Sequence, residues 1–155
     1  MEKAPQDFSD LELVYLARTA MKRAYCRYSN FPVGAALLTE SGDVVLGCNV
    51  ENASYGGTIC AERSAIVSAI SQGFKNFRAI AIATDMNDPA SPCGLCRQVL
   101  VEFGDFKVII GTASNTKLLV TTTMELLPNA FTPTSLDTFE MENSKQITDS
   151  SNVVN

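Results

Sequence analysis

Two short cysteine motifs constrain what this chain can fold into more than any other feature. The first is Cys60-Ala61-Glu62, and the second is Pro92-Cys93-Gly94-Leu95-Cys96. Each motif opens an apolar run that is typical of a helix, and the two runs end at Gly73 and Gly104. The fold must bring these two helix starts together if the three thiols are to form one group.

The spacing of apolar residues predicts alternating helices and strands. We expect helices at 8–24, 60–73 and 93–103, a helical turn at 124–127, and strands at 33–38, 44–50, 78–85, 107–111 and 116–123. This order predicts an α/β fold, a three-layer α/β/α sandwich with a central mixed five-stranded sheet. Right-handed crossovers on either side of the strand at 78–85 would place both cysteine motifs at one edge of that sheet.

The length of 155 residues suits one domain. We expect that domain to cover residues 8–140 and the polar stretch 141–155 to be a flexible tail. No apolar run approaches the roughly 18 residues that a membrane helix needs, and the N-terminus has no apolar signal region. We therefore expect a cytoplasmic protein without a membrane partner.

The charge of the chain disfavours a nucleic-acid partner. The net charge is −5, and Lys and Arg are scattered rather than gathered in a run. Phosphate neutralisation by a basic face supplies much of the affinity for a polynucleotide. A small neutral ligand fits this composition better.

The chain contains no histidine, which excludes a Ser-His-Asp triad, a Cys-His pair and histidine-containing zinc fingers. Acid–base chemistry near neutral pH must then use a carboxylate, a lysine, a tyrosine or a thiol. The odd number of cysteines, without a secretory signal, argues against a disulfide framework. Cys26 and Cys48 lack clustered partners, so we expect them to be small buried hydrophobic residues or incidental surface thiols.

The clustered thiols indicate zinc. Helix starts stabilise thiolates, so Cys60, Cys93 and Cys96 can supply three sulfur ligands. A structural zinc site is normally closed by four protein ligands, whereas three leave a place for water. Glu62, two residues after Cys60, is close enough to reach that water without being a ligand.

Three thiolates give the centre a net negative charge, which makes bound water harder to ionise. A cation beside the sulfur atoms corrects this. Arg63 follows Glu62, and Arg97 follows Cys96. We expect Arg63 to be the stronger candidate and Arg97 to share its role, although each can also be read as a surface arginine.

The two motifs resemble the H-x-E…P-C-x-x-C signature of nucleobase deaminases, with cysteine in the first position. The chain resembles the small homotetrameric cytidine deaminases over roughly residues 11–133. Besides the zinc motifs, the resemblance includes Phe31-Pro32-Val33-Gly34-Ala35-Ala36, the segment 49–56 and the segment 92–98. No motif position departs from the family pattern.

This resemblance implies hydrolytic deamination of free cytidine and 2′-deoxycytidine to uridine and 2′-deoxyuridine plus ammonia, in pyrimidine salvage. One Zn²⁺ per subunit would be bound by the three cysteines, and zinc-activated hydroxide would attack C4. Glu62 would carry the proton to N3 and then to the leaving amine. The fold implied is that of the cytidine deaminases.

The resemblance also implies a set of substrate contacts. Asn49 and Glu51 would bind the ribose hydroxyls, the Ala61 backbone would contact the base, and Phe31 would stack near it. Tyr55 and Phe131 match positions through which neighbouring subunits of a homotetramer complete each site, although Phe131 also fits an ordinary core or interface residue. The implied substrate-binding residues are Phe31, Asn49, Glu51, Ala53, Tyr55, Ala61 and Phe131.

Other functions remain open at this stage. A blasticidin-S-type deaminase has the same three cysteines and glutamate. A polynucleotide-editing deaminase would need a basic groove and usually a histidine ligand. The Cys93-x-x-Cys96 pair alone also fits a thiol–disulfide redox motif, and a structural zinc module would lack its fourth ligand.

Overall fold

A five-stranded sheet forms the centre of the molecule in this computed structural model, which describes residues 6–151. The strand order is β2-β1-β3-β4-β5. The strands are β1 (Val33–Thr39), β2 (Val44–Cys48), β3 (Phe77–Thr84), β4 (Lys107–Thr112) and β5 (Leu118–Thr122). β3 and β4 are parallel, and the other neighbouring pairs are antiparallel. The predicted mixed five-stranded sheet is confirmed.

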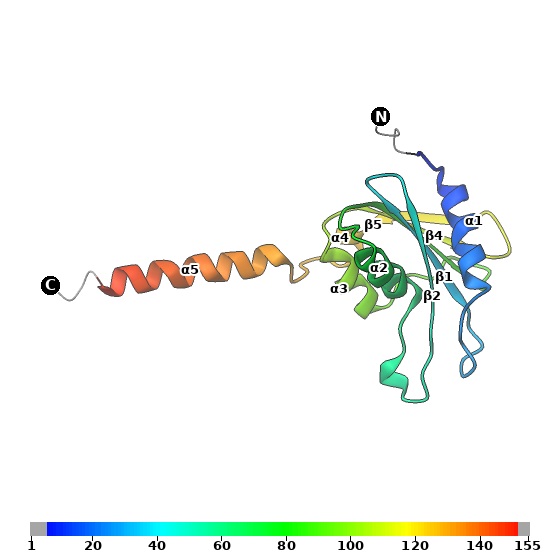
Figure 1. The fold of residues 1–155 in the computed structure, drawn as a ribbon, viewed down its shortest axis with the longest axis horizontal. Helices are drawn as coiled ribbons and strands as arrows, with labels where there is room; N and C mark the ends of the chain where they lie inside the picture. Colours follow the sequence, from blue (N-terminus) through cyan, green and yellow to red (C-terminus); the bar gives the residue numbers. More distant parts are fainter. Residues whose placement is uncertain (1–5, 152–155) are drawn as a thin grey trace.

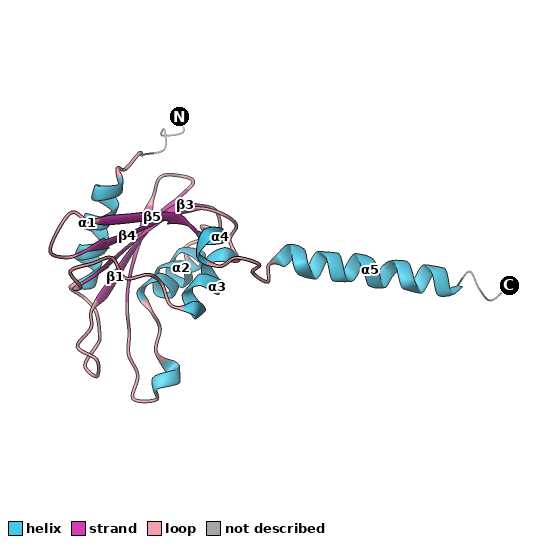
Figure 2. Ribbon diagram, turned by 180° about the vertical axis from the view of Figure 1, so that it is seen from behind, coloured by secondary structure: helices cyan, strands magenta, loops and turns pink. Residues whose placement is uncertain are grey.

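Helices cover both faces of this sheet (Figures 1 and 2). α1 (Asp10–Met21) lies on one face, and α2 (Ala61–Ser71) and α3 (Gly94–Val101) lie on the other. A 3-10 turn (Tyr55–Gly57), α4 (Thr123–Leu126) and α5 (Pro133–Ser151) complete the described elements. The predicted three-layer sandwich is therefore confirmed.

The strands divide their side chains between two cores because successive residues of a strand point to opposite faces. Leu37, Ile80 and Ile82 pack toward α2 and α3, whereas Leu38 and Ala81 pack toward α1. All of these side chains are buried. The sheet therefore gives both layers of helices an apolar surface, and it fixes where α2 and α3 begin.

α2 packs unusually close to β2 because small residues face each other. Ala61, Ala65 and Ala69 are fully buried on the sheet side of the helix. A Cβ atom on Gly47 would lie 2.4 Å from the backbone nitrogen of Ala65 and 2.5 Å from the carbonyl oxygen of Ala61. The predicted close approach of this small-residue helix to the sheet is confirmed, and Gly47 makes it possible.

The C-terminal part differs from the expected loose tail. α5 spans Pro133–Ser151 and projects away from the sheet (Figure 1). Proline at the first helical position is pre-organised for a helix, and Glu140 and Met141 favour helix formation. Residues 152–155 of the predicted tail lie outside the described residues, and the boundary at residue 140 stays a prediction. No helix within 6–151 combines the length and apolar character of a membrane span.

The contact between β2 and α2 leads to a stability prediction. Gly47→Ala should lower the free energy of unfolding by about 1–3 kcal/mol or more, because the new methyl group overlaps helix backbone that cannot move independently. Urea denaturation followed by circular dichroism measures this change. Gly56→Ala is the matched control, since a Cβ at Gly56 meets nothing within 4 Å. Equal stability of the two variants would show that α2 does not need this close approach.

Candidate metal centre

The three cysteines of the two motifs meet at the N-termini of α2 and α3. Cys60 is the N-cap residue of α2, Cys93 is the N-cap residue of α3, and Cys96 lies in the first turn of α3. Their sulfur atoms all lie within 4.8 Å of one another. The Sγ atoms of Cys60 and Cys93 are 3.8 Å apart. Tetrahedral zinc with Zn–S bonds of about 2.3 Å holds its sulfur ligands about 3.8 Å apart, so the three thiols fit a zinc ion.

A closed loop delivers Cys60 to this position. The loop from Glu51 to Thr58 leaves the end of β2 and returns to it. Its base is closed by two backbone hydrogen bonds between Val50 and Ile59, of 2.9 and 3.0 Å. Because Ile59 is held against Val50, Cys60 begins α2 at a fixed place beside the sheet.

Arg97 fixes the approach to the second motif. Its Nε donates to the carbonyl oxygen of Pro92 at 2.8 Å, and its Nη1 donates to the carbonyl oxygen of Leu126 at 2.9 Å. These bonds connect the loop before Cys93 to the end of α4. The guanidinium is thus engaged with backbone oxygens, and its share in charge compensation stays a prediction.

Arg63 lies beside the thiols. Its Nη2 donates to Cys60 Sγ at 3.6 Å and to the carbonyl oxygen of Thr58 at 3.1 Å. The hydrogen bond from the Cys96 thiol, followed by that from Arg63, lowers the pKa of Cys60 to about 5. The hydrogen bond to Cys60, together with burial, raises the pKa of Cys96. Arg63 and Cys96 thus both act to stabilise a negative charge on Cys60.

Glu62 is a buried carboxyl group in the first turn of α2 and has a relative exposure of 4%. Burial raises the pKa of Glu62, and the nearby charge of Cys60 adds to the effect. A carboxyl group whose pKa is moved toward neutrality can both accept and release a proton at working pH. This environment suits the proton transfer expected of Glu62.

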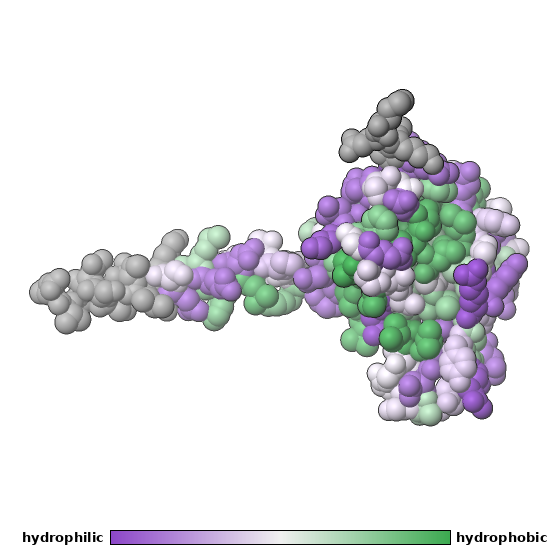
Figure 3. All heavy atoms as spheres, in the orientation of Figure 1, coloured by the Kyte–Doolittle hydropathy of each residue, from purple (hydrophilic) through white to green (hydrophobic). Residues whose placement is uncertain are grey.

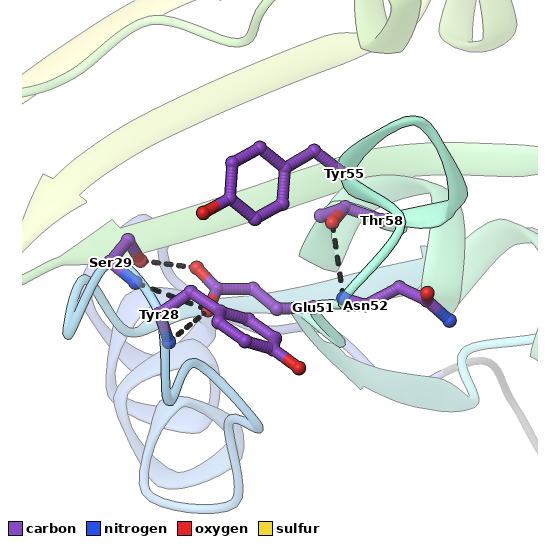
Figure 4. A pocket seen from close by; sticks show the side chains of 6 residues that line it. All are labelled: Tyr28, Ser29, Glu51, Asn52, Tyr55 and Thr58. Atoms are coloured by element: carbon purple, nitrogen blue, oxygen red, sulfur yellow. Dashed lines mark hydrogen bonds between the residues drawn. The ribbon is translucent and has the colours of Figure 1, made fainter.

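A cavity of about 260 Å³ is lined in part by Thr58 (Figure 4), whose carbonyl oxygen accepts the hydrogen bond from Arg63. Its Glu51 carboxylate accepts hydrogen bonds from the backbone N–H groups of Tyr28 (2.8 Å) and Ser29 (3.2 Å) and from the Ser29 hydroxyl. The bond from the Ser29 hydroxyl is the main cause that lowers the pKa of Glu51. The carboxylate is therefore charged at neutral pH. The cavity is lined by Tyr28, Ser29, Glu51, Asn52, Tyr55 and Thr58.

Asn49 holds the segment that carries Phe31. Its Nδ2 donates to the carbonyl oxygen of Phe31 and its Oδ1 accepts from the Val33 N–H, both at 2.9 Å. Asn49 is buried, whereas Phe31 is partly exposed. The structure thus gives Asn49 a structural task that the sequence does not reveal, and its ribose contact stays a prediction.

The remaining expected contact residues differ in accessibility. Ala61 is fully buried at the start of α2, while Ala53 is exposed in the loop. Tyr55 and Phe131 are 76% and 60% exposed, so Phe131 is not a core residue within this chain. Tyr28, Ser29 and Thr58 line the cavity, although none of them is among the substrate-binding residues that the resemblance implies. The sequence signals for them are the position of Tyr28 and Ser29 just before the Phe31 motif and that of Thr58 in the polar loop that starts at Glu51.

The part of the chain that contains the cysteine cluster matches a known family. Residues 8–112, which include both cysteine motifs, match the family model described as "Cytidine and deoxycytidylate deaminase zinc-binding region". The chain belongs to this deaminase family. The deaminase cluster of Cys60, Cys93 and Cys96 is accordingly the part of the chain that is positioned to bind zinc.

Individual relatives and solved structures agree with the family. The chain is 48% identical over 122 residues to a cytidine deaminase of Halalkalibacterium halodurans, covering 77% of this chain and 92% of the relative. It is 45% identical over 127 residues to a cytidine deaminase of Sporosarcina psychrophila, covering 81% and 93%. A crystal structure of cytidine deaminase from Burkholderia pseudomallei superposes with a TM-score of 0.77 at 44% identity, covering 80% of this chain and all of that one.

One further relative bears on the choice of substrate. A blasticidin-S deaminase of Bacillus cereus is 36% identical over 132 residues, covering 79% of this chain and 92% of that protein. Its identity is lower than that of the two cytidine deaminases described above. The chain is thus similar to deaminases with two different names, and more similar to these two cytidine deaminases.

The cluster geometry predicts the effect of removing one sulfur. Cys93→Ala should lose most of its bound zinc and its activity, because two thiols cannot replace a three-sulfur site. Zinc per protein chain, measured by mass spectrometry after gel filtration, tests this. Cys26→Ala is the control, since Cys26 is a half-buried free cysteine outside the cluster. A Cys93→Ala protein without zinc but with full activity would contradict a zinc mechanism.

Proposed function

We propose that the protein is a zinc-dependent hydrolase that deaminates free cytidine and 2′-deoxycytidine to uridine and 2′-deoxyuridine, releasing ammonia. The observation that carries this proposal is the three-sulfur cluster at two helix starts with the buried Glu62 in the adjoining helical turn. Three protein ligands leave a place for water, which a catalytic site requires. The relatives at 45% and 48% identity are cytidine deaminases, which supports the choice of substrate.

Zinc, when bound, lowers the pKa of a water molecule and so provides a nucleophile near neutral pH for attack at C4 of the pyrimidine. The remaining chemistry falls to Glu62. Its carboxylate takes the proton from the water and delivers it to N3 of the ring. It then takes the second proton from the oxygen added at C4 and passes it to the amino group, so that the C4–N bond breaks, ammonia leaves and a carbonyl remains at C4. Burial keeps Glu62 away from bulk water and suits it to this exchange.

The cavity that contains Glu51 and Thr58 would hold the nucleoside (Figure 4). Glu51 is charged there and can accept a hydrogen bond from a ribose hydroxyl. Asn49 would contribute to the same recognition, Phe31 would cover the base, and the Ala61 backbone would contact it. Ala53 would lie at the margin of this site.

Arg63 would offset the negative charge of the three thiolates. Its hydrogen bond to Cys60 supports this role. In addition, its Nε atom is buried and has no hydrogen-bond partner within the described part of the chain. Arg97 would assist mainly by holding the loop that carries Cys93, since its two hydrogen bonds go to that loop and to α4.

We propose that the protein forms a homotetramer. We also propose that it lies in the cytoplasm and acts in pyrimidine salvage. Tyr55 and Phe131 are exposed aromatic side chains that neighbouring subunits would use to complete each site. Apolar side chains also gather on the surface over α2 and α3 (Figure 3). A groove of about 620 Å³ is found there and includes five apolar residues, namely Ile66, Val67, Ile70, Val99 and Phe103.

A blasticidin-S-type deaminase is the second candidate, and the Bacillus cereus relative favours it. Side-by-side assays on cytidine and blasticidin S separate the two substrates. A polynucleotide substrate is disfavoured by the net charge of −5. A redox pair needs two thiols and leaves Cys60 and Glu62 unexplained, and a structural zinc site lacks its fourth ligand among the residues of this cluster.

The role of Glu62 can be separated from that of the metal. Glu62→Gln should keep its zinc and its fold but lower kcat for cytidine by about 10²–10⁴-fold, because only the proton carrier is lost. Ultraviolet absorbance follows the conversion of cytidine to uridine, and zinc content is measured on the same sample. Glu40→Gln is the control, since Glu40 is an exposed carboxyl group in the turn between β1 and β2. Full activity of Glu62→Gln would exclude Glu62 as the proton carrier.

A further inference from the structure

Ser29 lines the cavity together with Glu51, although no motif points to it. Its hydroxyl group donates to Oε1 of Glu51 and accepts a hydrogen bond from the backbone N–H of Phe31 at 3.0 Å. A serine hydroxyl has only one proton to donate, and here Glu51 receives it. One side chain therefore joins the carboxylate of Glu51 to the backbone of Phe31 (Figure 4 draws the bond to Glu51).

The contacts from this loop leave Glu51 with little freedom. A carboxylate has about four acceptor positions. Oε2 receives the N–H groups of Tyr28 at 2.8 Å and Ser29 at 3.2 Å, and Oε1 receives the Ser29 hydroxyl. One acceptor position, on Oε1, remains in a carboxylate that lines the cavity. Glu51 can therefore accept one hydroxyl group of a ligand, and a second would have to displace a bond to the loop.

The loop itself does not depend on the Ser29 hydroxyl. The backbone N–H of Asn30 donates to the carbonyl oxygen of Cys26 at 2.8 Å, which closes the turn. Asn49 independently holds Phe31 and Val33 through two further bonds of 2.9 Å. Loss of the hydroxyl should therefore change the orientation of the Glu51 carboxylate more than the path of the chain.

We propose that Ser29 is a positioning residue for nucleoside recognition, because its hydroxyl fixes the Glu51 carboxylate so that it accepts one sugar hydroxyl. The inference rests on the proposed deamination of cytidine and on the contact of Glu51 with the sugar. Two consequences follow. Ser29 contributes to substrate binding rather than to the chemical step, and only one of the two ribose hydroxyls is recognised through Glu51.

Steady-state kinetics of Ser29→Ala test the first consequence. The KM for cytidine should rise about tenfold or more, as expected when a hydrogen bond to a charged group is lost. The kcat value should change less than about twofold, because an interaction made equally in the ground state and the transition state affects KM alone. Ser29→Thr keeps the hydroxyl and should restore KM to within about twofold.

Ser41→Ala is the matched control. The Ser41 hydroxyl donates to the Asp43 carboxylate at 2.7 Å, which is a comparable serine–carboxylate bond in the turn at the opposite end of β1. This variant should keep the KM of the unmodified protein. A Ser29→Ala protein with the same KM as Ser41→Ala, or with reduced kcat at unchanged KM, would overturn the proposal.

Substrate analogues test the second consequence. The affinities of cytidine, 2′-deoxycytidine and 3′-deoxycytidine are compared in unmodified protein and Ser29→Ala, as KM or, for a poor substrate, as a competitive inhibition constant. Ser29→Ala should leave the affinity unchanged for one of the two deoxynucleosides, namely the one that lacks the hydroxyl bound by Glu51. A penalty that persists for both, or disappears for both, would contradict recognition of a single hydroxyl.

The same assays distinguish failure of this inference from failure of the proposed function. If zinc-loaded unmodified protein converts cytidine and only the Ser29→Ala prediction fails, the proposed function is supported and the positioning role of Ser29 is refuted. If the unmodified protein does not convert cytidine, the proposed function fails first, and the role of Ser29 fails with it.

Discussion

Three sulfur atoms can meet in this protein only because the first turns of α2 and α3 arrive at the same end of one sheet. α2 follows β2, α3 follows β3, and both helices pack on the same face of the sheet. Their N-termini therefore lie at the same end of the sheet. The close contact with Gly47 fixes how near α2 lies to the sheet. The Arg97 bonds to Pro92 and Leu126 hold the loop that leads into α3. The metal centre is therefore a consequence of how the layers pack.

This arrangement places opposing electrostatic demands on neighbouring residues. Thiolates must be stabilised for zinc to bind, and the helix starts and Arg63 do so. Glu62, one residue away from Arg63, must instead keep a raised pKa to exchange protons. Burial achieves this because it disfavours the charged carboxylate more than the neighbouring guanidinium stabilises it. Two adjacent positions of one helical turn thus experience different environments.

Much of the fold and the centre of the site could be predicted from the sequence. The alternation of apolar runs predicts the three layers, and the Cys60 and Cys93 motifs predict the cluster, because periodicity and ligand spacing are local properties. The partners of Arg97 and Asn49 could not be predicted, since they are backbone groups brought near by tertiary structure. The bond of Ser29 to Glu51 could not be predicted either, since the two residues lie 22 positions apart and meet only in the folded chain. α5 could not be predicted from apolar periodicity, because its apolar residues, such as Leu136 and Phe139, are exposed and pack on no core.

The coordination of zinc in the purified protein tests the three-sulfur catalytic site most directly. Zinc K-edge X-ray absorption spectroscopy counts the ligands and measures their distances. A catalytic centre built from Cys60, Cys93 and Cys96 predicts three sulfur ligands at about 2.3 Å and one oxygen ligand at about 2.0 Å. A spectrum with four sulfur ligands, or protein that binds no zinc when supplied with it, would contradict an open catalytic site.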